Sequence, residues 1–177
     1  LNLGKIILAF SETASANSVT LPQQFTIQSH ADLSTVGAKS RALSAGTKSS
    51  TDSTSITITL DEDDLNFIKA DTGLASTAAT TFLAYTEDAA KDVSGNKVVA
   101  GVHQVKADGS GGFLFTKDTT DPELDDFSID MNTGTVSLTF SESVDTNTFD
   151  ETAITLQSAQ DGTAGTTKKL SPLSTAK

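Results

Sequence analysis

The sequence predicts an all-β protein, an antiparallel β-sandwich with one short helical segment. Hydrophobic residues are 36% and aromatic residues 6% of the 177-residue chain, which contains 21 Ser and 28 Thr. In this Thr-rich background, apolar and polar residues alternate in short segments, separated by turns that contain Gly and Asn. Period-two alternation is typical of strands that bury one face. Such strands at intervals of roughly 10 to 20 residues favour a sandwich.

An internal repeat is the strongest organisational feature of the chain. Gly4–Glu12 aligns with Gly134–Glu142, an offset of 130 residues, and both segments end in Phe-Ser-Glu. After a one-residue gap the alignment continues, because Phe25–Ser29 falls on Ile154–Ser158. The sequence therefore predicts tandem repeats of about 130 residues.

The repeat predicts where one module ends and the next begins. Residues 1–117 are expected to form one module that lacks its first strand, and residues 118–177 the N-terminal half of a second, homologous module. The seam at Asp118–Pro122 is acidic and contains a proline, which cannot donate to a sheet ladder. We therefore expect a solvated connection there.

The strands follow from the apolar pattern. Ile6–Phe10 is continuously apolar, which predicts a central strand covered on both faces. The Ser/Thr-rich stretch Ser44–Ser55 is expected to be a flexible loop that joins two strands. The alternating segments expected to be strands are Phe25–Ile27, Ile56–Leu60, Phe82–Ala84, Phe127–Met131 and Val136–Phe140.

One segment departs from the strand pattern. Residues 61–70 begin with four acidic residues, which can cap a helix N-terminus, and carry Leu65 and Ile68 at helical spacing. We expect one or two helical turns near 62–70.

In the predicted turn at 92–96, Asp92 is expected to bond back to the backbone and Gly95 to adopt a positive φ. Gly109–Gly112 precedes a strand-like segment, which indicates a turn and not a phosphate-binding loop.

Composition and charge argue against several classes of protein. The net charge of −11 disfavours binding to nucleic acid, and the longest apolar run is too short to span a membrane. The chain has no Cys, which excludes a disulfide scaffold and a thiolate zinc site. The two histidines, His30 and His103, lack a second ligand at metal-binding spacing, so we expect surface residues.

The acidic clusters are the candidates for chemistry. Ten carboxylates and no Lys or Arg lie between Asp118 and Glu151. Calcium prefers such oxygen ligands, and a site at the module junction could gather Asp118, Asp121 and Glu123 with Glu12 from the preceding module. The alternative is a solvated acidic surface. A pair of carboxylates acting as acid and base would require a cleft with a subsite for substrate. The few aromatic residues of the chain do not indicate such a subsite.

Two motifs carry a resemblance to a known family. Gly4–Glu12 near the start and Asp92–Asn96 near the end resemble the paired signatures of bacterial Ig-like domains of the S-layer type. The opening Asp118–Pro122 and the following Phe127–Met131 are similar to tandem repeats in giant surface and adhesion proteins of cyanobacteria, marine protists and algae. Residues 64–69 are similar to a segment of the protist version. The resemblance implies Ig-like β-sandwiches strung end to end, and it implies no catalytic residue.

The expected function is therefore structural and not enzymatic. The resemblance implies a secreted or cell-surface protein that serves as a stalk, coat, filament or adhesin. If the acidic cluster binds calcium, we expect the ion to stiffen the junctions between modules. Its expected partners are neighbouring modules of the same protein and further copies that assemble into filaments. An alternative is a module that binds glycans or a surface within a larger secreted protein, although Tyr85 is the only Tyr and Trp is absent.

Overall fold

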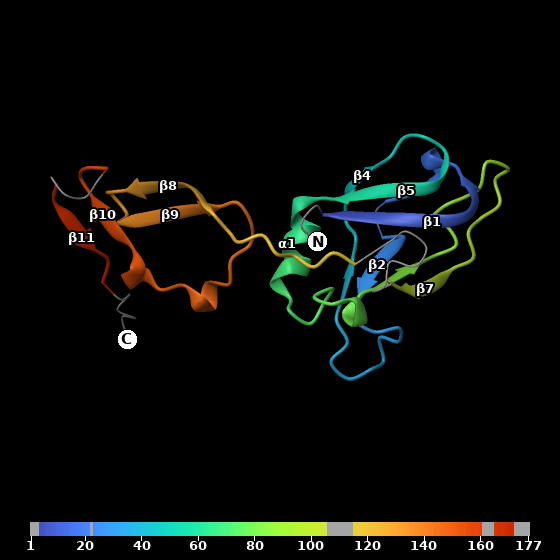
Figure 1. Cartoon of the computed structure of the whole chain (residues 1–177), viewed down its shortest axis with the longest axis horizontal. Coiled ribbons are helices and arrows are strands. Elements are labelled where there is room, and N and C mark those ends of the chain that lie inside the picture. The colour runs from blue at the N-terminus through green and yellow to red at the C-terminus, as the bar shows by residue number, and fades with distance from the viewer. Residues whose placement is uncertain (1–3, 22, 106–114, 161–164, 172–177) are drawn as a thin grey trace. The chain divides into compact units, whose positions relative to one another are not determined.

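A computed structural model describes residues 4–21, 23–105, 115–160 and 165–171 (Figure 1). Most of its regular elements are strands in antiparallel sheets, and one α-helix is present among the described residues. This confirms the predicted all-β, sandwich-like fold. The predicted turn at Gly109–Gly112 lies outside the described residues. The chain divides into two compact units, Leu1–Ser143 and Val144–Lys177.

The first unit contains two sheets. One has the strand order β1-β5-β4 and the other β3-β2-β6-β7. Every pair within them is antiparallel. The strand bounds are β1 Lys5–Ala14, β2 Phe25–Gln28, β3 Ser40–Ala42, β4 Gly46–Lys48, β5 Ser53–Leu60, β6 Phe82–Tyr85 and β7 Gly101–Gln104.

Side chains from both sheets share one hydrophobic core. Leu8, Ile56 and Ile58 come from the first sheet, and Phe25 and Ile27 from the second, and all are buried. Burial of one face per strand matches the alternating apolar pattern, because successive side chains of a strand point to opposite sides. The core also receives Leu43, Ile68, Leu74 and Val19 from the connecting segments.

One α-helix and four short 3₁₀ turns are found among the described residues besides the strands. Helix α1 spans Glu62–Ala70, as the acidic segment predicts, and the Asp61 side chain accepts a hydrogen bond from the Asp64 backbone N–H at its N-terminus. Ile68 faces the core and is 1% exposed. The 3₁₀ turns η1 Ala16–Ser18 and η2 Ala78–Thr80 lie in the first unit, and η3 Thr146–Thr148 in the second.

The second copy of the repeated strand forms a hairpin. β8 (Leu124–Asp130) pairs with β9 (Thr135–Phe140) in a two-stranded antiparallel sheet, which belongs to the first compact unit. In the second unit, η4 (Glu151–Ala153) precedes β10 (Thr155–Gln157), which pairs with β11 (Thr167–Lys169). The compact units thus divide after Ser143, whereas the sequence repeat starts a new module at Asp118.

Two details of the strand prediction are wrong. Residues 6–10 belong to β1, which lies at an edge of its described sheet, and its exposure alternates, with Ile7 48% exposed and Leu8 8% exposed. A strand that contacts the core on one face buries every second residue, whatever the polarity of the others. The stretch Ser44–Ser55 is not a simple loop, because it contains β4 and the start of β5.

The turn at Asp92 forms as expected. The Asp92 side chain accepts hydrogen bonds from the backbone N–H groups of Ser94 and Asn96, and Gly95 has φ +92°. These bonds hold the pKa of Asp92 below its ordinary value, with the Asn96 side chain as the largest contributor.

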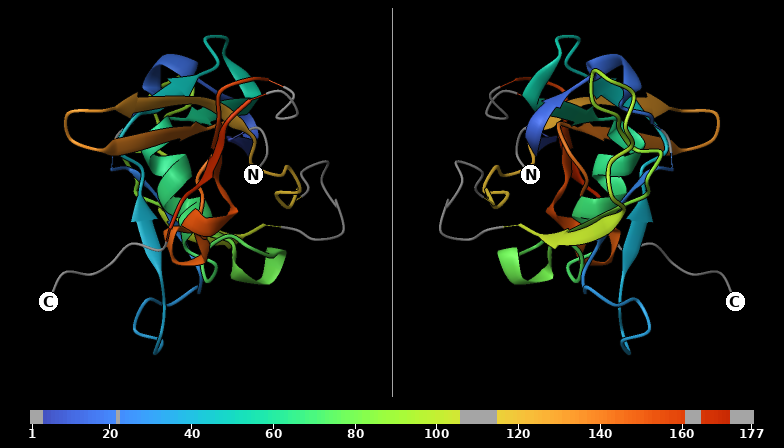
Figure 2. Two further views of the ribbon diagram at one scale, coloured as in Figure 1. Left: turned by 90° about the vertical axis from the view of Figure 1, so that its left-hand side faces the viewer. Right: turned by 90° about the vertical axis from the view of Figure 1, so that its right-hand side faces the viewer.

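The loop between β2 and β3 extends away from both sheets and leaves Val36 99% exposed (Figures 1 and 2).

Gly46 is the glycine whose replacement we expect to be most damaging. It has φ +135°, and a Cβ atom there would lie 2.5 Å from the backbone oxygen of Thr59 on β5. We expect Gly46→Ala to lower the free energy of unfolding by about 2 kcal/mol, measured by urea denaturation. Gly37→Ala is the matched control, because Gly37 has φ +81° but open space around it, so only the backbone cost of about 1 kcal/mol applies. Equal losses in both variants would contradict the proposed clash.

Candidate functional site

The most enclosed charged cluster that involves the repeat surrounds Lys69. The Lys69 ammonium lies 2.7 Å from Asp118 Oδ2 and 2.5 Å from Glu142 Oε2. The side chains of Lys69 and Glu142 are each 12% exposed, and that of Asp118 is 27% exposed. We call these three residues the junction cluster, because Asp118 opens the predicted second module and Glu142 ends its repeated Phe-Ser-Glu.

The positions of these three residues in the helix and beside the hairpin explain why their side chains are in contact. Lys69 lies in the last turn of α1, where a cation interacts favourably with the helix dipole. Glu142 follows the last residue of β9 by two positions, and Asp118 precedes β8. The base of the hairpin is closed by the Ser141 N–H, which donates to the Glu123 carbonyl at 2.9 Å. Helix and hairpin therefore each contribute a charge to the cluster.

The cluster shifts the pKa values of two of its members. Burial lowers the pKa of Lys69, but the hydrogen bonds and charges of Asp118 and Glu142 outweigh it and raise the pKa above its ordinary value. Burial raises the pKa of Asp118, but the Lys69 ammonium and the Thr120 backbone N–H outweigh it and lower the pKa. Both shifts favour the charged forms, so the ion pairs stabilise the fold at neutral pH.

The cluster is not electrically balanced. One ammonium faces two carboxylates, which leaves a formal charge of −1. Glu142 Oε1 is buried and has no hydrogen-bond partner among the described residues. An unpaired buried acceptor carries a cost in free energy. In this cluster, the attraction of Asp118 and Glu142 to Lys69 offsets that cost.

The predicted calcium ligands are distributed as follows. Asp118 is ion-paired with Lys69, whereas Glu12, Asp121 and Glu123 are exposed. Over the described ranges, no group of three or more His, Cys, Asp or Glu side chains is arranged to hold a metal ion. The structure thus does not gather the four predicted ligands into one site, and calcium binding stays a prediction.

A second charged pair lies inside the first unit. Asp64 is fully buried, and its carboxylate accepts hydrogen bonds from Arg41 Nε at 2.6 Å and from the backbone N–H of Ser44 at 2.6 Å. The Ser44 hydroxyl and the Ala45 N–H add two further bonds. The Arg41 guanidinium also lies 4.7 Å from the centre of the Phe67 ring. These contacts tie α1 to β3 through Arg41, and to the segment between β3 and β4 through Ser44 and Ala45.

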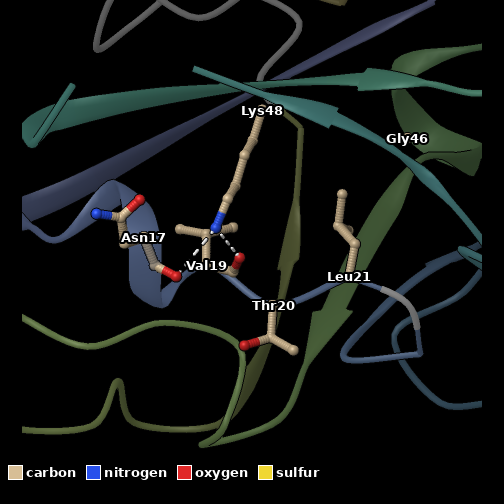
Figure 3. Close-up of a pocket in the computed structure, with 6 residues that line it drawn as sticks. All are labelled: Asn17, Val19, Thr20, Leu21, Gly46 and Lys48. Carbon is tan, nitrogen blue, oxygen red and sulfur yellow. Dashed lines mark hydrogen bonds between the residues drawn. The ribbon is translucent and has the colours of Figure 1, made fainter. Parts of the chain in front are cut away.

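A hollow in the described part of the chain has a lysine in its lining. Its volume is about 300 Å³, and it is lined by Asn17, Val19, Thr20, Leu21, Gly46 and Lys48 (Figure 3). The Lys48 ammonium donates to the carbonyls of Asn17 and Val19, which links β4 to the turn η1 (Figure 3). Burial lowers the pKa of Lys48.

Neither histidine adds to a site among the described residues. His30 Nδ1 hydrogen-bonds the Ser29 hydroxyl, and the His103 ring stacks on Tyr85 with the ring centres 5.7 Å apart. No described helix is long and apolar enough to cross a membrane. In comparisons with known proteins, no family model, curated protein or solved structure matches this chain.

Sequence reasoning identified Asp118 but missed its partners. Glu142, the last residue of the repeated Phe-Ser-Glu, pairs with Lys69, and the repeat alone did not indicate that partner. The available signal was the scarcity of cations. Between Asp118 and Glu151 there is no Lys or Arg, so any basic partner had to come from elsewhere, such as the one Lys of the helical segment.

Proposed function

We propose that this chain is part of a structural, extracellular repeat protein, in which Ig-like modules are joined end to end as a stalk, coat, filament or adhesin. The observation that carries the proposal is the binding of Glu142 by Lys69. Glu142 is the last residue of the repeated motif, and it is held by the helix that follows β5 of the preceding copy. A residue that recurs in each repeat and binds the repeat before it suits a tandem array.

The position of the other copy of the motif supports the same arrangement. Glu12, the counterpart of Glu142, is exposed near the C-terminal end of β1. At the opposite end of this strand, a Cβ atom added to Gly4 would lie 3.1 Å from the Leu65 side chain, so α1 is close to that end. One module would therefore present the glutamate at one end and the lysine-bearing helix at the other, which is the polarity that a head-to-tail array requires.

The composition fits a protein that works by holding its shape. A surface rich in Ser and Thr with a net charge of −11 keeps a long array soluble. Modules that contact mainly their neighbours need only a modest core each. Immunostaining of intact, unpermeabilised source cells tests the location. We expect staining at the surface, and signal only after permeabilisation would contradict the extracellular assignment.

Calcium stiffening is a separable part of the proposal. The residual charge of −1 in the junction cluster and the exposed carboxylates of Asp121 and Glu123 are the features that a cation would neutralise. We expect millimolar calcium to raise the melting temperature of the full chain relative to chelator. A free calcium concentration of 100 times the dissociation constant adds about 2.7 kcal/mol to the free energy of unfolding. A shift in melting temperature below about 1 °C would therefore count against a structural site.

A further inference from the structure

Lys48 lies on β4, the last strand of the order β1-β5-β4, which pairs with β5 on one side and with no described strand on the other. Lys48 is opposite Ile58, which is fully buried. Because cross-strand partners share a face of the sheet, the Lys48 side chain points toward the core side. It reaches across to the segment before β2 and donates to the carbonyls of Asn17 and Val19 (Figure 3).

Lys48 differs from Arg41 and Lys69 in having no carboxylate partner among the described residues. Arg41 and Lys69 each form an ion pair with a carboxylate, whereas Lys48 is held by two backbone carbonyls. A carbonyl accepts a hydrogen bond but does not neutralise the positive charge. Burial therefore lowers the pKa of Lys48, because no negative charge offsets the loss of hydration.

Other charged residues bind the turn η1, next to Lys48, without pairing with its ammonium. The Asp52 carboxylate accepts a hydrogen bond from the Ala16 N–H at 2.8 Å, and the Lys91 carbonyl accepts one from the Ser18 hydroxyl at 3.0 Å. An ammonium group has three N–H donors, and the two carbonyls use two of them. One donor of Lys48 is therefore available to a ligand.

The hollow beside Lys48 has the size and the lining of a small-ligand site. Its volume of about 300 Å³ is at the lower end of the range for such sites. Val19 and Leu21 supply apolar lining, and the Leu21 side chain extends toward Gly46 (Figure 3). Gly46 lines the hollow with its backbone alone, since it has no side chain.

The backbone of β4 adds further donors on the same side. The Ser49 N–H donates to the Thr57 carbonyl at 2.9 Å, so Ser49 and Thr57 form a hydrogen-bonded pair of the β4–β5 ladder. Bonded positions alternate along an antiparallel strand. The N–H groups of Gly46 and Lys48 therefore point away from β5, on the side where these two residues line the hollow.

We propose that this hollow binds a carboxylate that carries a short apolar body. The carboxylate would pair with the Lys48 ammonium and the Gly46 N–H, and the apolar body would lie against Val19 and Leu21. Charge complementarity selects this ligand, because a carboxylate supplies the negative charge that Lys48 lacks. A free aliphatic acid and the acid group of a sugar share this chemistry. The site adds a binding function to the proposed structural role and does not depend on it.

Titration of the isotope-labelled full chain with butyrate, followed by NMR, tests the proposal. We expect the amide signals of Leu21, Gly46 and Lys48 to shift with a dissociation constant on the order of 1 mM, since the ligand is small. Bound butyrate should raise the pKa of Lys48, because the ion pair favours the ammonium form. Butanol has no carboxylate and should leave these signals unchanged. Glucuronate distinguishes the two sources, since tighter binding than butyrate assigns a sugar acid and weaker binding an aliphatic acid.

Lys48→Met removes the ammonium but keeps most of the side-chain stem, and we expect it to weaken butyrate binding by about tenfold or more. Lys97→Met is the matched control, because Lys97 already pairs with Glu87 and Asp88, and it should bind butyrate like the parent chain. The proposal is overturned if butyrate shifts none of the three amide signals, or if Lys48→Met binds it as well as the parent does. An unchanged Lys48 pKa at saturating butyrate would also overturn it, and that measurement needs no variant.

Discussion

Replacing Asp64 by alanine is expected to lower the free energy of unfolding by about 4 kcal/mol, because it removes one partner of a buried ion pair. The Asp64 side chain is fully buried, and four hydrogen bonds from Arg41, Ser44 and Ala45 converge on its carboxylate. Its loss leaves the Arg41 guanidinium and the Ser44 N–H without their acceptor. Urea denaturation of the full chain measures the effect.

Two further variants, Asp63→Ala and Asp64→Asn, test whether the loss comes from the buried carboxylate. Asp63 is exposed in the same first turn of α1, so its replacement should change stability little. Asp64→Asn keeps the volume, but its amide presents two donors where donors already converge, and we expect most of the loss to remain. If Asp64→Ala were no more destabilising than Asp63→Ala, the buried pair would not stabilise the fold.

The same carboxylate predicts a loss of stability in acid. Burial raises the pKa of Asp64, but the hydrogen bonds from Ser44, Arg41 and Ala45 outweigh it and hold the pKa below 3.8. A carboxyl group whose pKa is lower in the folded state stabilises the protein above its unfolded pKa. That contribution is lost as the pH falls below about 4, and the parent chain should lose more stability there than Asp64→Asn.

Lys69→Met is expected to have the second largest effect, a loss of about 3 kcal/mol in unfolding free energy at neutral pH. The substitution retains much of the side-chain volume but leaves Asp118 and Glu142 facing each other without a cation. Hydrogen exchange of the β8–β9 amides should also accelerate, because the link between α1 and the hairpin is lost.

Lys97→Met provides a closely matched control for this variant. Lys97 also bridges two carboxylates, those of Glu87 at 3.1 Å and Asp88 at 2.8 Å, but all three side chains are more than 40% exposed. Exposed ion pairs contribute little, so we expect no measurable change. Similar losses for Lys69→Met and Lys97→Met would contradict a special role for the junction cluster.

High pH should weaken the junction cluster in the parent chain. Because the folded pKa of Lys69 lies above 10.5, its ion pairs contribute fully below that pH and are lost as the pH rises through the folded pKa. Lys69→Met lacks this component, so the difference in stability between the two proteins should shrink above about pH 10.5.

Short sequence patterns predicted the elements that depend on residues a few positions apart. The acidic start of the segment at 61–70 forms the helix cap, and Asp92 forms its turn, because each depends on residues within a few positions. The alternation at 56–60 predicted β5 because burial on one face leaves a period of two. These features required no knowledge of the tertiary structure.

Features that depend on distant partners were not predicted. Ile6–Phe10 was expected to lie in the centre of a sheet, but its place is set by which strands pair with it. β4 was missed because its residues are polar and are held by pairing with β5. Within the acidic start of α1, the pattern did not single out Asp64 as buried, since that is decided by Arg41, 23 residues earlier.

The intact mass of the native polypeptide, with peptide sequencing, tests most directly whether this chain belongs to a tandem array. We predict a mass many times 18.3 kDa and further peptides that repeat the Phe-Ser-Glu pattern at intervals of about 130 residues. A native mass near 18.3 kDa, with no further copies of the pattern, would contradict the array.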